Sequence, residues 1–349
     1  MSTYRKASLQ GFHPYVPGFQ PPDGEGWVKL NTNECPFPPS PRVAAAVTAA
    51  SARLQLYPDP TQRELREAGA RALDVSPDQL VFGNGADEVL AMAVRAFVPR
   101  GGAAAHLDPS YSLVPPLLAI NDVELELHPI TADGGLPESF LQSRAPLRFI
   151  TNPNSPTGAV FAAEFIAEAC ERASGVVVVD EAYVDFAPDS VLDLLPSFDN
   201  MLVVRTMSKS YSLAGLRLGF AVGAPALVED ILAVKDPSNV DRLAMAAGIA
   251  ALDDREHWQD SVATVVASRQ RLTEALRERG WDVPESGANF VFGRPPRPAA
   301  DVYRELFERR VLVRHFDRPG LADRLRVTIG TWDECEALLR ALDSVEALS

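Results

Sequence analysis

Six short apolar runs between residues 79 and 223 most constrain how this chain folds. The runs are residues 80–82, 103–107, 147–150, 176–179, 202–204 and 218–222. Runs of this length, apolar almost throughout, are typical of strands buried on both faces of a mainly parallel sheet. Segments with helical spacing lie between them, as where Val89, Ala93 and Phe97 recur at intervals of four residues. We therefore predict a doubly wound α/β domain that binds ligands beyond the carboxyl ends of its strands.

The rest of the chain predicts an N-terminal arm and a second, smaller domain. The first forty residues are rich in Pro and Gly, which disfavour regular helix. Residues 255–279 have the pattern of a long helix, and shorter apolar runs and helices follow it. Thr331 and Glu334 have capping-box spacing and open a final helix. The predicted division is an arm at 1–40, a large α/β domain at 41–250 and a small α+β domain at 251–349, with which the N-terminal segment could pack.

Charge and cysteine usage narrow the class of protein. A formal net charge of −14 disfavours a nucleic-acid partner. Cys35, Cys170 and Cys335 are odd in number and far apart, which indicates neither a disulfide framework nor a metal site. Residues 1–11 lack an apolar segment, and no later stretch approaches the ~20 apolar residues needed to span a bilayer. We expect a cytoplasmic protein without a membrane partner.

A segment directly after one apolar run, residues 206–219 (TMSKSYSLAGLRLG), gathers hydroxyls, one lysine and one arginine. A lysine that forms imines must lose its proton easily, and burial near the positive charge of Arg217 would favour the neutral amine of Lys209. Thr206, Ser208 and Arg217 could together bind a dianionic phosphate. The alternative is that Lys209 and Arg217 are solvated loop charges, the better interpretation for an isolated Ser-Lys-Ser.

A second candidate is Asp180, which ends the apolar run 176–179 and is followed by Glu-Ala-Tyr183. An acid at that place must be paired or functional, because burying it alone is costly. Opposite a pyridine nitrogen, the carboxylate would keep the nitrogen protonated and let a cofactor ring accept electrons. The structural alternative is an acid that caps the next helix.

The segment Gly83-Asn-Gly-Ala-Asp87 forms a predicted turn from a strand into a helix that begins near Ala86. Glycine turns of this kind direct free amides at an anion. They occur in most α/β proteins, so this turn is evidence for an anion site only in combination with the two motifs above.

These motifs resemble those of the fold-type I aminotransferases, which depend on pyridoxal 5'-phosphate. The motifs that match in order and spacing are NPNSPTG at 152–158, DEAY at 180–183, Ser208-Lys209 and Arg217-Leu-Gly219. Further segments are similar to the histidinol-phosphate aminotransferase family: KLNTNE at 29–34, Tyr57-Pro, GADE at 85–88, DEAYVDF at 180–186 and LRVTIG at 325–330. The resemblance covers nearly the whole chain. It implies a large domain with a mainly parallel seven-stranded sheet and a smaller α+β domain.

The resemblance also implies roles for individual residues. Lys209 would hold the cofactor as a Schiff base and move a proton, Asp180 would pair with the pyridine nitrogen, and Tyr183 would bind the ring hydroxyl. The other implied cofactor-binding residues are Gly85, Ala86, Asp87, Tyr111 (stacked on the ring), Asn154, Ser155, Thr206, Ser208, Arg217 and Tyr57. The implied substrate-binding residues are Arg326, for a carboxylate, Arg314, for the substrate phosphate, Tyr15 and Asn33. Tyr57 would reach the phosphate of a neighbouring subunit, which implies a homodimer with shared active sites.

The chain departs from the family pattern at Ser155, where relatives usually have an Asn whose amide binds the ring oxygen. We hypothesise that Ser155 acts weakly or through water, or that Asn154 takes over. Cys35 likewise replaces a second Asn in the arm. Arg318 and Arg324 are predicted to be solvated surface charges, an interpretation that Arg314 also allows.

By resemblance the reaction converts histidinol phosphate and 2-oxoglutarate to imidazole acetol phosphate and glutamate, in histidine biosynthesis. Two alternatives share the cofactor residues: an aromatic amino-acid transaminase and a threonine-phosphate decarboxylase. A third, from a different class, is a non-catalytic regulatory module that binds the cofactor. Such regulators carry a DNA-binding domain, and this acidic chain has no basic helix-turn-helix segment. A nucleotide-binding Rossmann protein is disfavoured because no G-x-G-x-x-G follows the first strand.

Overall fold

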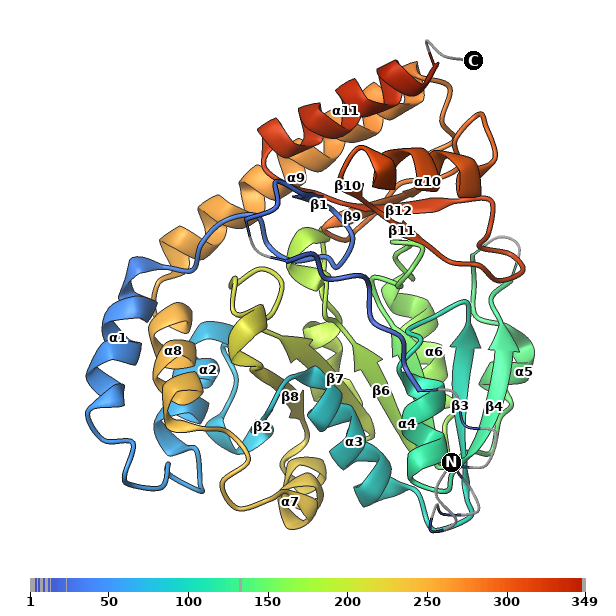
Figure 1. The fold of residues 1–349 in the computed structure, drawn as a ribbon. Coiled ribbons are helices and arrows are strands. Elements are labelled where there is room, and N and C mark those ends of the chain that lie inside the picture. The colour runs from blue at the N-terminus through green and yellow to red at the C-terminus, as the bar shows by residue number, and fades with distance from the viewer. Residues whose placement is uncertain are drawn as a thin grey trace.

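The computed structural model describes residues 4, 6, 9, 12, 14–22, 24–131 and 134–346, and its centre is a seven-stranded sheet (Figure 1). The strands are β2 (Leu80–Gly83), β3 (Ala103–Asp108), β4 (Glu124–Pro129), β5 (Leu147–Thr151), β6 (Val176–Asp180), β7 (Met201–Thr206) and β8 (Gly219–Gly223), in the order β2-β8-β7-β6-β5-β3-β4. Only β8 runs antiparallel to its neighbours. The prediction of a mainly parallel sheet is confirmed, and each of the six apolar runs forms a strand.

The sequence pattern missed β4, the strand at one edge of the sheet. Its residues, ELELHP, alternate charged and apolar side chains, and none of them is fully buried. An edge strand pairs on one side only and is partly exposed to solvent, so it lacks the continuous apolar run that marks central strands.

Helices cover both faces of this sheet and one of its ends. Helices α3 (Ala86–Phe97), α4 (Val114–Ile120) and α7 (Pro225–Val234) share one core with it, and α5 (Glu138–Leu141) and α6 (Ala163–Glu171) share another. At the β2–β8 end, α1 (Pro41–Ser51), α2 (Arg63–Leu73) and α8 (Arg242–Leu252) form a third core. Short 3-10 segments lie at Pro77–Gln79, Val184–Phe186, Val191–Ser197 and Ala214–Leu216. None of the described helices is long and apolar enough to cross a membrane.

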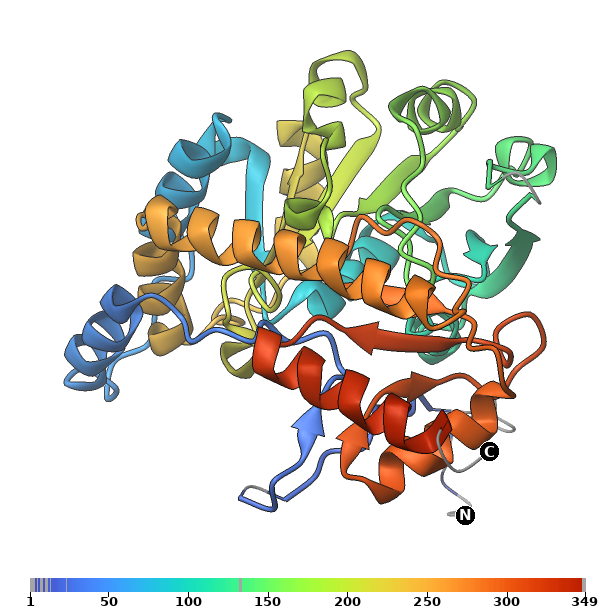
Figure 2. The ribbon, with the colours of Figure 1, turned by 90° about the horizontal axis from the view of Figure 1, so that it is seen from above.

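The C-terminal part forms a separate α+β layer, beside which the long helix α9 (Arg255–Glu278) crosses the molecule (Figure 2). It contains β9 (Phe290–Gly293), α10 (Ala299–Glu308), β10 (Val311–Leu312), β11 (Arg314–His315), β12 (Leu325–Thr328) and α11 (Trp332–Glu346). Strands β11, β12 and β9 form an antiparallel sheet. The predicted capping box is present, because the N–H of Thr331 donates to Glu334 Oε2 (2.7 Å) and that of Glu334 to Thr331 Oγ1 (3.3 Å).

The N-terminal segment joins this C-terminal layer. Strand β1 (Val28–Lys29) pairs parallel with β10, and Leu30 lies in the same apolar core as α9, α10 and α11. Residues 14–22 contain no helix or strand, in keeping with their proline content. The predicted boundary at residue 250 falls in the last turn of α8, and the division into domains stays a prediction.

A buried arginine, Arg148 of β5, ties the ends of two helices to the sheet. It is 1% exposed, and its guanidinium donates to the carbonyls of Leu141 (3.3 Å), Ser143, Ala169 (3.5 Å) and Arg172 (3.2 Å). These carbonyls lie at the C-terminal ends of α5 and α6, where helix dipoles favour a cation.

We expect Arg148→Met to lower the free energy of unfolding by about 3 kcal/mol, because several buried carbonyls would lose their donor. Chemical denaturation monitored by circular dichroism measures this loss. The matched control is Arg144→Met, since Arg144 lies on the loop that precedes β5 and is exposed. Equal stability of the two variants would contradict the assigned role of Arg148.

Candidate active site

A pocket lies where the carboxyl ends of the parallel strands face the C-terminal layer, with an empty volume of about 1150 Å³, its open mouth included. The predicted site residues that line it are Tyr15, Asn33, Ala86, Asp87, Tyr111, Ser155, Asp180, Tyr183, Thr206, Ser208, Lys209, Arg217, Arg314 and Arg326. Three predicted residues do not line it: Gly85, Asn154 and Tyr57. Residues from all parts of the chain thus meet at the place where α/β sheets bind ligands.

Asp180 ends β6 at the bottom of this pocket and is 5% exposed. Its Oδ1 accepts a hydrogen bond from the N–H of Ala182 (3.1 Å). Burial raises the pKa of Asp180 to about 7, and the nearby negative charges of Asp87 and Glu181 add to this effect. The carboxylate does not cap a helix, because Tyr183 is the N-cap of the next helical segment. The structural alternative for this acid is therefore wrong.

Lys209 extends into the same pocket from the loop after β7. Its Nζ donates to the carbonyl of Thr32 (3.3 Å) and lies 5.7 Å from the ring centroid of Tyr183. None of the ion pairs found in the described part of the chain includes Lys209. The residue is half-buried and its amine is not held in an ion pair, which leaves it available to react with a carbonyl group.

The N-terminus of α3 and Arg217 form an anion-binding end of the pocket. Arg217 Nη1 donates to Ser208 Oγ (3.4 Å), and its Nη2 is 3.0 Å from Asp87 Oδ2. Gly85 is the N-cap of α3, with φ 84°, and a Cβ there would lie 2.7 Å from Arg217 Nη2. The positive φ favours glycine at this position, and a Cβ would also displace the Arg217 guanidinium. First-turn amides, a guanidinium and a hydroxyl together suit a phosphate.

Tyr111 lies beside this anion-binding end. Its hydroxyl donates to Asp87 Oδ1 (2.9 Å), and burial raises the pKa of Tyr111 well above its ordinary value. This bond holds the aromatic ring at the wall of the pocket, where a planar ligand can stack on it.

The structure separates the two candidates for the ring-oxygen contact. Ser155 lines the pocket, and its Oγ accepts from Arg326 Nη1 (3.4 Å). The side-chain amide of Asn154, which does not line the pocket, instead donates to Pro109 O (3.2 Å) and to Oγ of the lining residue Ser110 (3.4 Å). The geometry therefore favours Ser155 over Asn154.

Two arginines from neighbouring strands face the other end of the pocket. Arg326 of β12 and Arg314 of β11 are register partners. Arg326 Nη2 donates to Asn31 O (3.1 Å), its Nε is buried without a hydrogen-bond partner, and burial lowers the pKa of the guanidinium. Arg314 donates to the carbonyls of Val16 (3.1 Å) and Pro17 (3.5 Å). Both cations bond only neutral groups, which leaves their charge for an anionic ligand.

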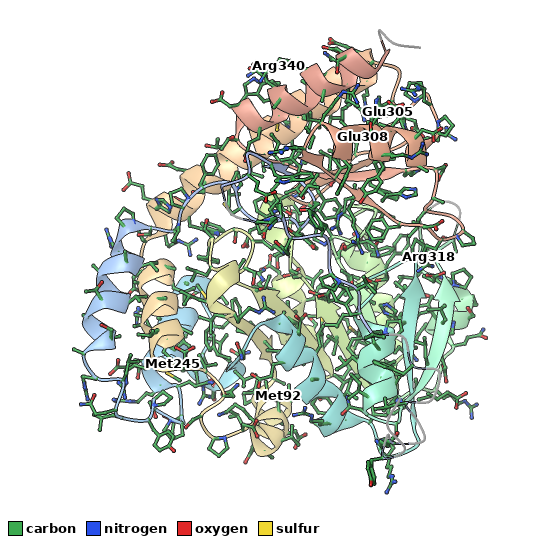
Figure 3. All side chains as sticks on the ribbon, in the orientation of Figure 1. Met92, Met245, Glu305, Glu308, Arg318 and Arg340 are labelled. Atoms are coloured by element: carbon green, nitrogen blue, oxygen red, sulfur yellow. The ribbon has the colours of Figure 1, made fainter. Side chains whose placement is uncertain are left out.

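Arg318 is exposed, as the sequence interpretation expected, but it is not a free surface charge. It lines the pocket and forms an ion pair with Asp108 at the end of β3, so it spans the gap between the two layers (Figure 3). Arg324 pairs with Asp282 (2.7 Å) and does not line the pocket. Asn31 and Thr32, which belong to the KLNTNE segment but were given no role, also line it, as does Phe316, which carried no sequence signal.

Tyr57 lies away from the pocket of its own chain. Its side chain is 89% exposed, and the nearby Leu54 and Leu56 are exposed as well. The backbone of Tyr57 is held by Arg242, whose Nη2 donates to the Tyr57 carbonyl (2.6 Å). Within one chain, this residue makes no contribution to the site.

Comparison with known proteins identifies the family. Residues 25–342 match the family model described as "Aminotransferase class I and II". The chain is 43% identical over 333 residues to a histidinol-phosphate aminotransferase from Geotalea uraniireducens, covering 95% of this chain and 96% of the relative. It is 39% identical over 345 residues to histidinol-phosphate aminotransferase 1 from Trichormus variabilis, covering 98% and 99%.

A solved structure agrees with this result. The crystal structure of histidinol-phosphate aminotransferase from Sinorhizobium meliloti, in complex with pyridoxal-5'-phosphate, superposes with a TM-score of 0.90 at 25% identity. The match covers 100% of this chain and 99% of that structure. The agreement of sequence, fold and site geometry leads to one conclusion: the chain belongs to the class I and II aminotransferases.

Proposed function

We propose that this chain transfers the amino group of histidinol phosphate to 2-oxoglutarate with pyridoxal 5'-phosphate as cofactor, yielding imidazole acetol phosphate and glutamate. The observation that carries the proposal is one pocket with Lys209 and Asp180 between an anion-binding end at Arg217 and a second cationic end at Arg314 and Arg326. The names of the relatives support the choice of substrate.

The residues present fit the cofactor. Asp180 is a buried carboxylate whose side chain has only one hydrogen-bond donor among the described contacts, so it can take a protonated ring nitrogen as partner. Arg217, Ser208 and the first amides of α3 converge where a phosphate would lie. Lys209 lines the same pocket as Asp180 and Arg217.

Each residue would then perform a definite task. When bound, pyridoxal phosphate supplies an electron-accepting ring that stabilises negative charge at the α-carbon of the donor. Lys209 would hold the cofactor, and its amine, when free, would take and return the α-proton of the donor. Asp180 keeps the ring nitrogen protonated, and Tyr183 donates toward the ring oxygen. Arg326 and Arg314 bind the phosphate or carboxylate of the two substrates.

We also propose a homodimer in which Tyr57 reaches the site of the partner subunit. Its exposure, together with that of Leu54 and Leu56, supports this arrangement, because an apolar group at the surface suits a protein interface. The proposed location is the cytoplasm. All three cysteines are free, which is usual in a reducing compartment.

The half-reaction without an acceptor tests the substrate assignment. Histidinol phosphate added to the cofactor-loaded protein is expected to remove the visible absorption band within one turnover, as the amino group moves to the cofactor. The same loss with phenylalanine, and none with histidinol phosphate, would indicate an aromatic transaminase. Release of carbon dioxide from threonine phosphate would indicate a decarboxylase. A stable band with every donor would indicate a module that binds the cofactor without turnover.

A further inference from the structure

A chain of buried hydrogen bonds joins the N-terminal segment and β12 to Tyr183. Asn33 is 1% exposed and has a φ of 57°, a left-handed conformation that Asn tolerates better than most residues. Its N–H donates to Thr328 Oγ1 (2.9 Å), and Thr328 Oγ1 lies 3.0 Å from Asn33 Oδ1. Asn33 Nδ2 lies 3.0 Å from Tyr183 Oη. The Nδ2 of Asn289 donates to the Asn33 carbonyl (3.0 Å), which fixes the backbone in place.

The direction of this chain follows from its backbone end. A backbone N–H can only donate, so the oxygen of Thr328 accepts there. Thr328 is 3% exposed, and among the described contacts Asn33 Oδ1 is the one acceptor for its hydroxyl proton, so a flipped amide would leave this buried proton unpaired. That contact determines which end of the Asn33 amide carries oxygen, an orientation that amide geometry alone leaves open. The Nδ2 group therefore faces Tyr183 and donates to its oxygen. The Tyr183 oxygen thus accepts from Asn33, and the proton of its hydroxyl takes no part in this series of hydrogen bonds.

We propose that Asn33 is a positioning residue that commits the Tyr183 hydroxyl to donate its proton into the pocket. All the groups concerned are buried, so water does not compete for these positions. The inference rests on the proposed function, because the acceptor of the proton is the ring oxygen of the cofactor. It also revises the role of Asn33, which the resemblance implied to be substrate binding.

Ser155 stands where relatives usually have an Asn, and it also lines the pocket. Its Oγ accepts from Arg326, which leaves its own proton free to donate, so Tyr183 and Ser155 are two hydroxyls available to the ring oxygen. Arg326 and Thr328 are two residues apart on β12 and therefore point to the same face of the strand.

The test is the pH at which the visible band of the cofactor-loaded enzyme changes as the Lys209 nitrogen loses its proton. A donor at the ring oxygen offsets the negative charge that retains this proton, so loss of the donor raises the midpoint. Thr328→Val leaves the Asn33 amide free to turn its oxygen toward Tyr183, and we expect the midpoint to rise by about one pH unit. Thr328→Ser keeps the hydroxyl and is expected to retain the wild-type midpoint.

Two substitutions of Asn33 itself distinguish the direction of its hydrogen bond to Tyr183 from the packing of its side chain. Asn33→Asp has the same shape but accepts where Asn donates, so it should draw the Tyr183 proton away and raise the midpoint at least as far as Thr328→Val. Asn33→Gly tolerates the positive φ and removes the amide without reversing it, so its shift should be smaller.

Two results would overturn the role of Asn33, and a different result would overturn the proposed function. A midpoint that stays at the wild-type value in both Thr328→Val and Asn33→Asp, with the band and melting temperature intact, would overturn the inference. Equal shifts in Asn33→Gly and Asn33→Asp would do the same, because direction would then be irrelevant. Absence of a visible band in the wild-type protein, by contrast, would overturn the proposed function itself.

Discussion

Replacing Lys209 by alanine is expected to lower the rate of amino transfer by about 10⁴-fold or more, because one side chain both attaches the cofactor and moves the α-proton. The measurement is turnover of histidinol phosphate with 2-oxoglutarate, together with the visible spectrum of the protein loaded with cofactor. The variant should bind pyridoxal phosphate through Arg217 and α3 but lack the band that the linkage to lysine produces.

A matched pair of controls isolates the chemistry from the charge. Lys209→Arg keeps a cation in the pocket but cannot form the linkage, so it should be as inactive as the alanine variant. Lys6→Ala removes a lysine that is ion-paired with Asp122 and does not line the pocket, so it should leave turnover unchanged. Substantial activity in Lys209→Ala would refute the proposed mechanism at its centre.

Asp180→Asn is expected to change activity and stability in opposite directions. Without a carboxylate the ring nitrogen loses the group that keeps it protonated, and turnover should fall roughly 100-fold. The protein without cofactor should instead become more stable, because the buried charge is gone. A group that is costly for folding and needed for catalysis is typical of active sites.

The pH dependence of this stabilisation follows from the raised pKa. Asp180 titrates at about 7 in the folded chain, against an ordinary value of 3.8. Between these values the folded state holds a proton that the unfolded state has lost, so stability decreases as pH rises from 3.8 to 7. The penalty is complete above pH 7 and absent below 3.8. The variant should therefore gain stability on the order of 3 kcal/mol at pH 8 and nothing at pH 3.5.

Thermal or chemical unfolding of the cofactor-free proteins at several pH values measures this effect. Asp189→Asn is the matched control, since Asp189 lies in the irregular segment that follows β6 and is exposed. It should alter neither stability nor turnover. A pH-independent difference between Asp180→Asn and wild type would show that the carboxylate is not the group that loses stability as the pH rises.

The sequence by itself determined the framework of the protein. Central strands were predictable because burial on both faces requires continuous apolar runs, as in Val176–Val179. The placement of Asp180 and Lys209 followed from this, because residues after parallel strands meet at one edge of the sheet. The edge strand β4 was missed because solvent on one side removes the apolar signal.

Only the tertiary structure decided the contacts between these elements. Asn33 meets Tyr183 across 150 positions and Thr328 across 295, and Arg318 meets Asp108 across 210. It was likewise the folded geometry that buried Asn154 against Pro109 and Ser110 and placed Ser155 in the pocket lining. The physical reason is that periodicity reports on a residue's exposure within its own helix or strand, whereas a hydrogen bond or ion pair depends on distance and direction between segments that the chain brings together only when it folds.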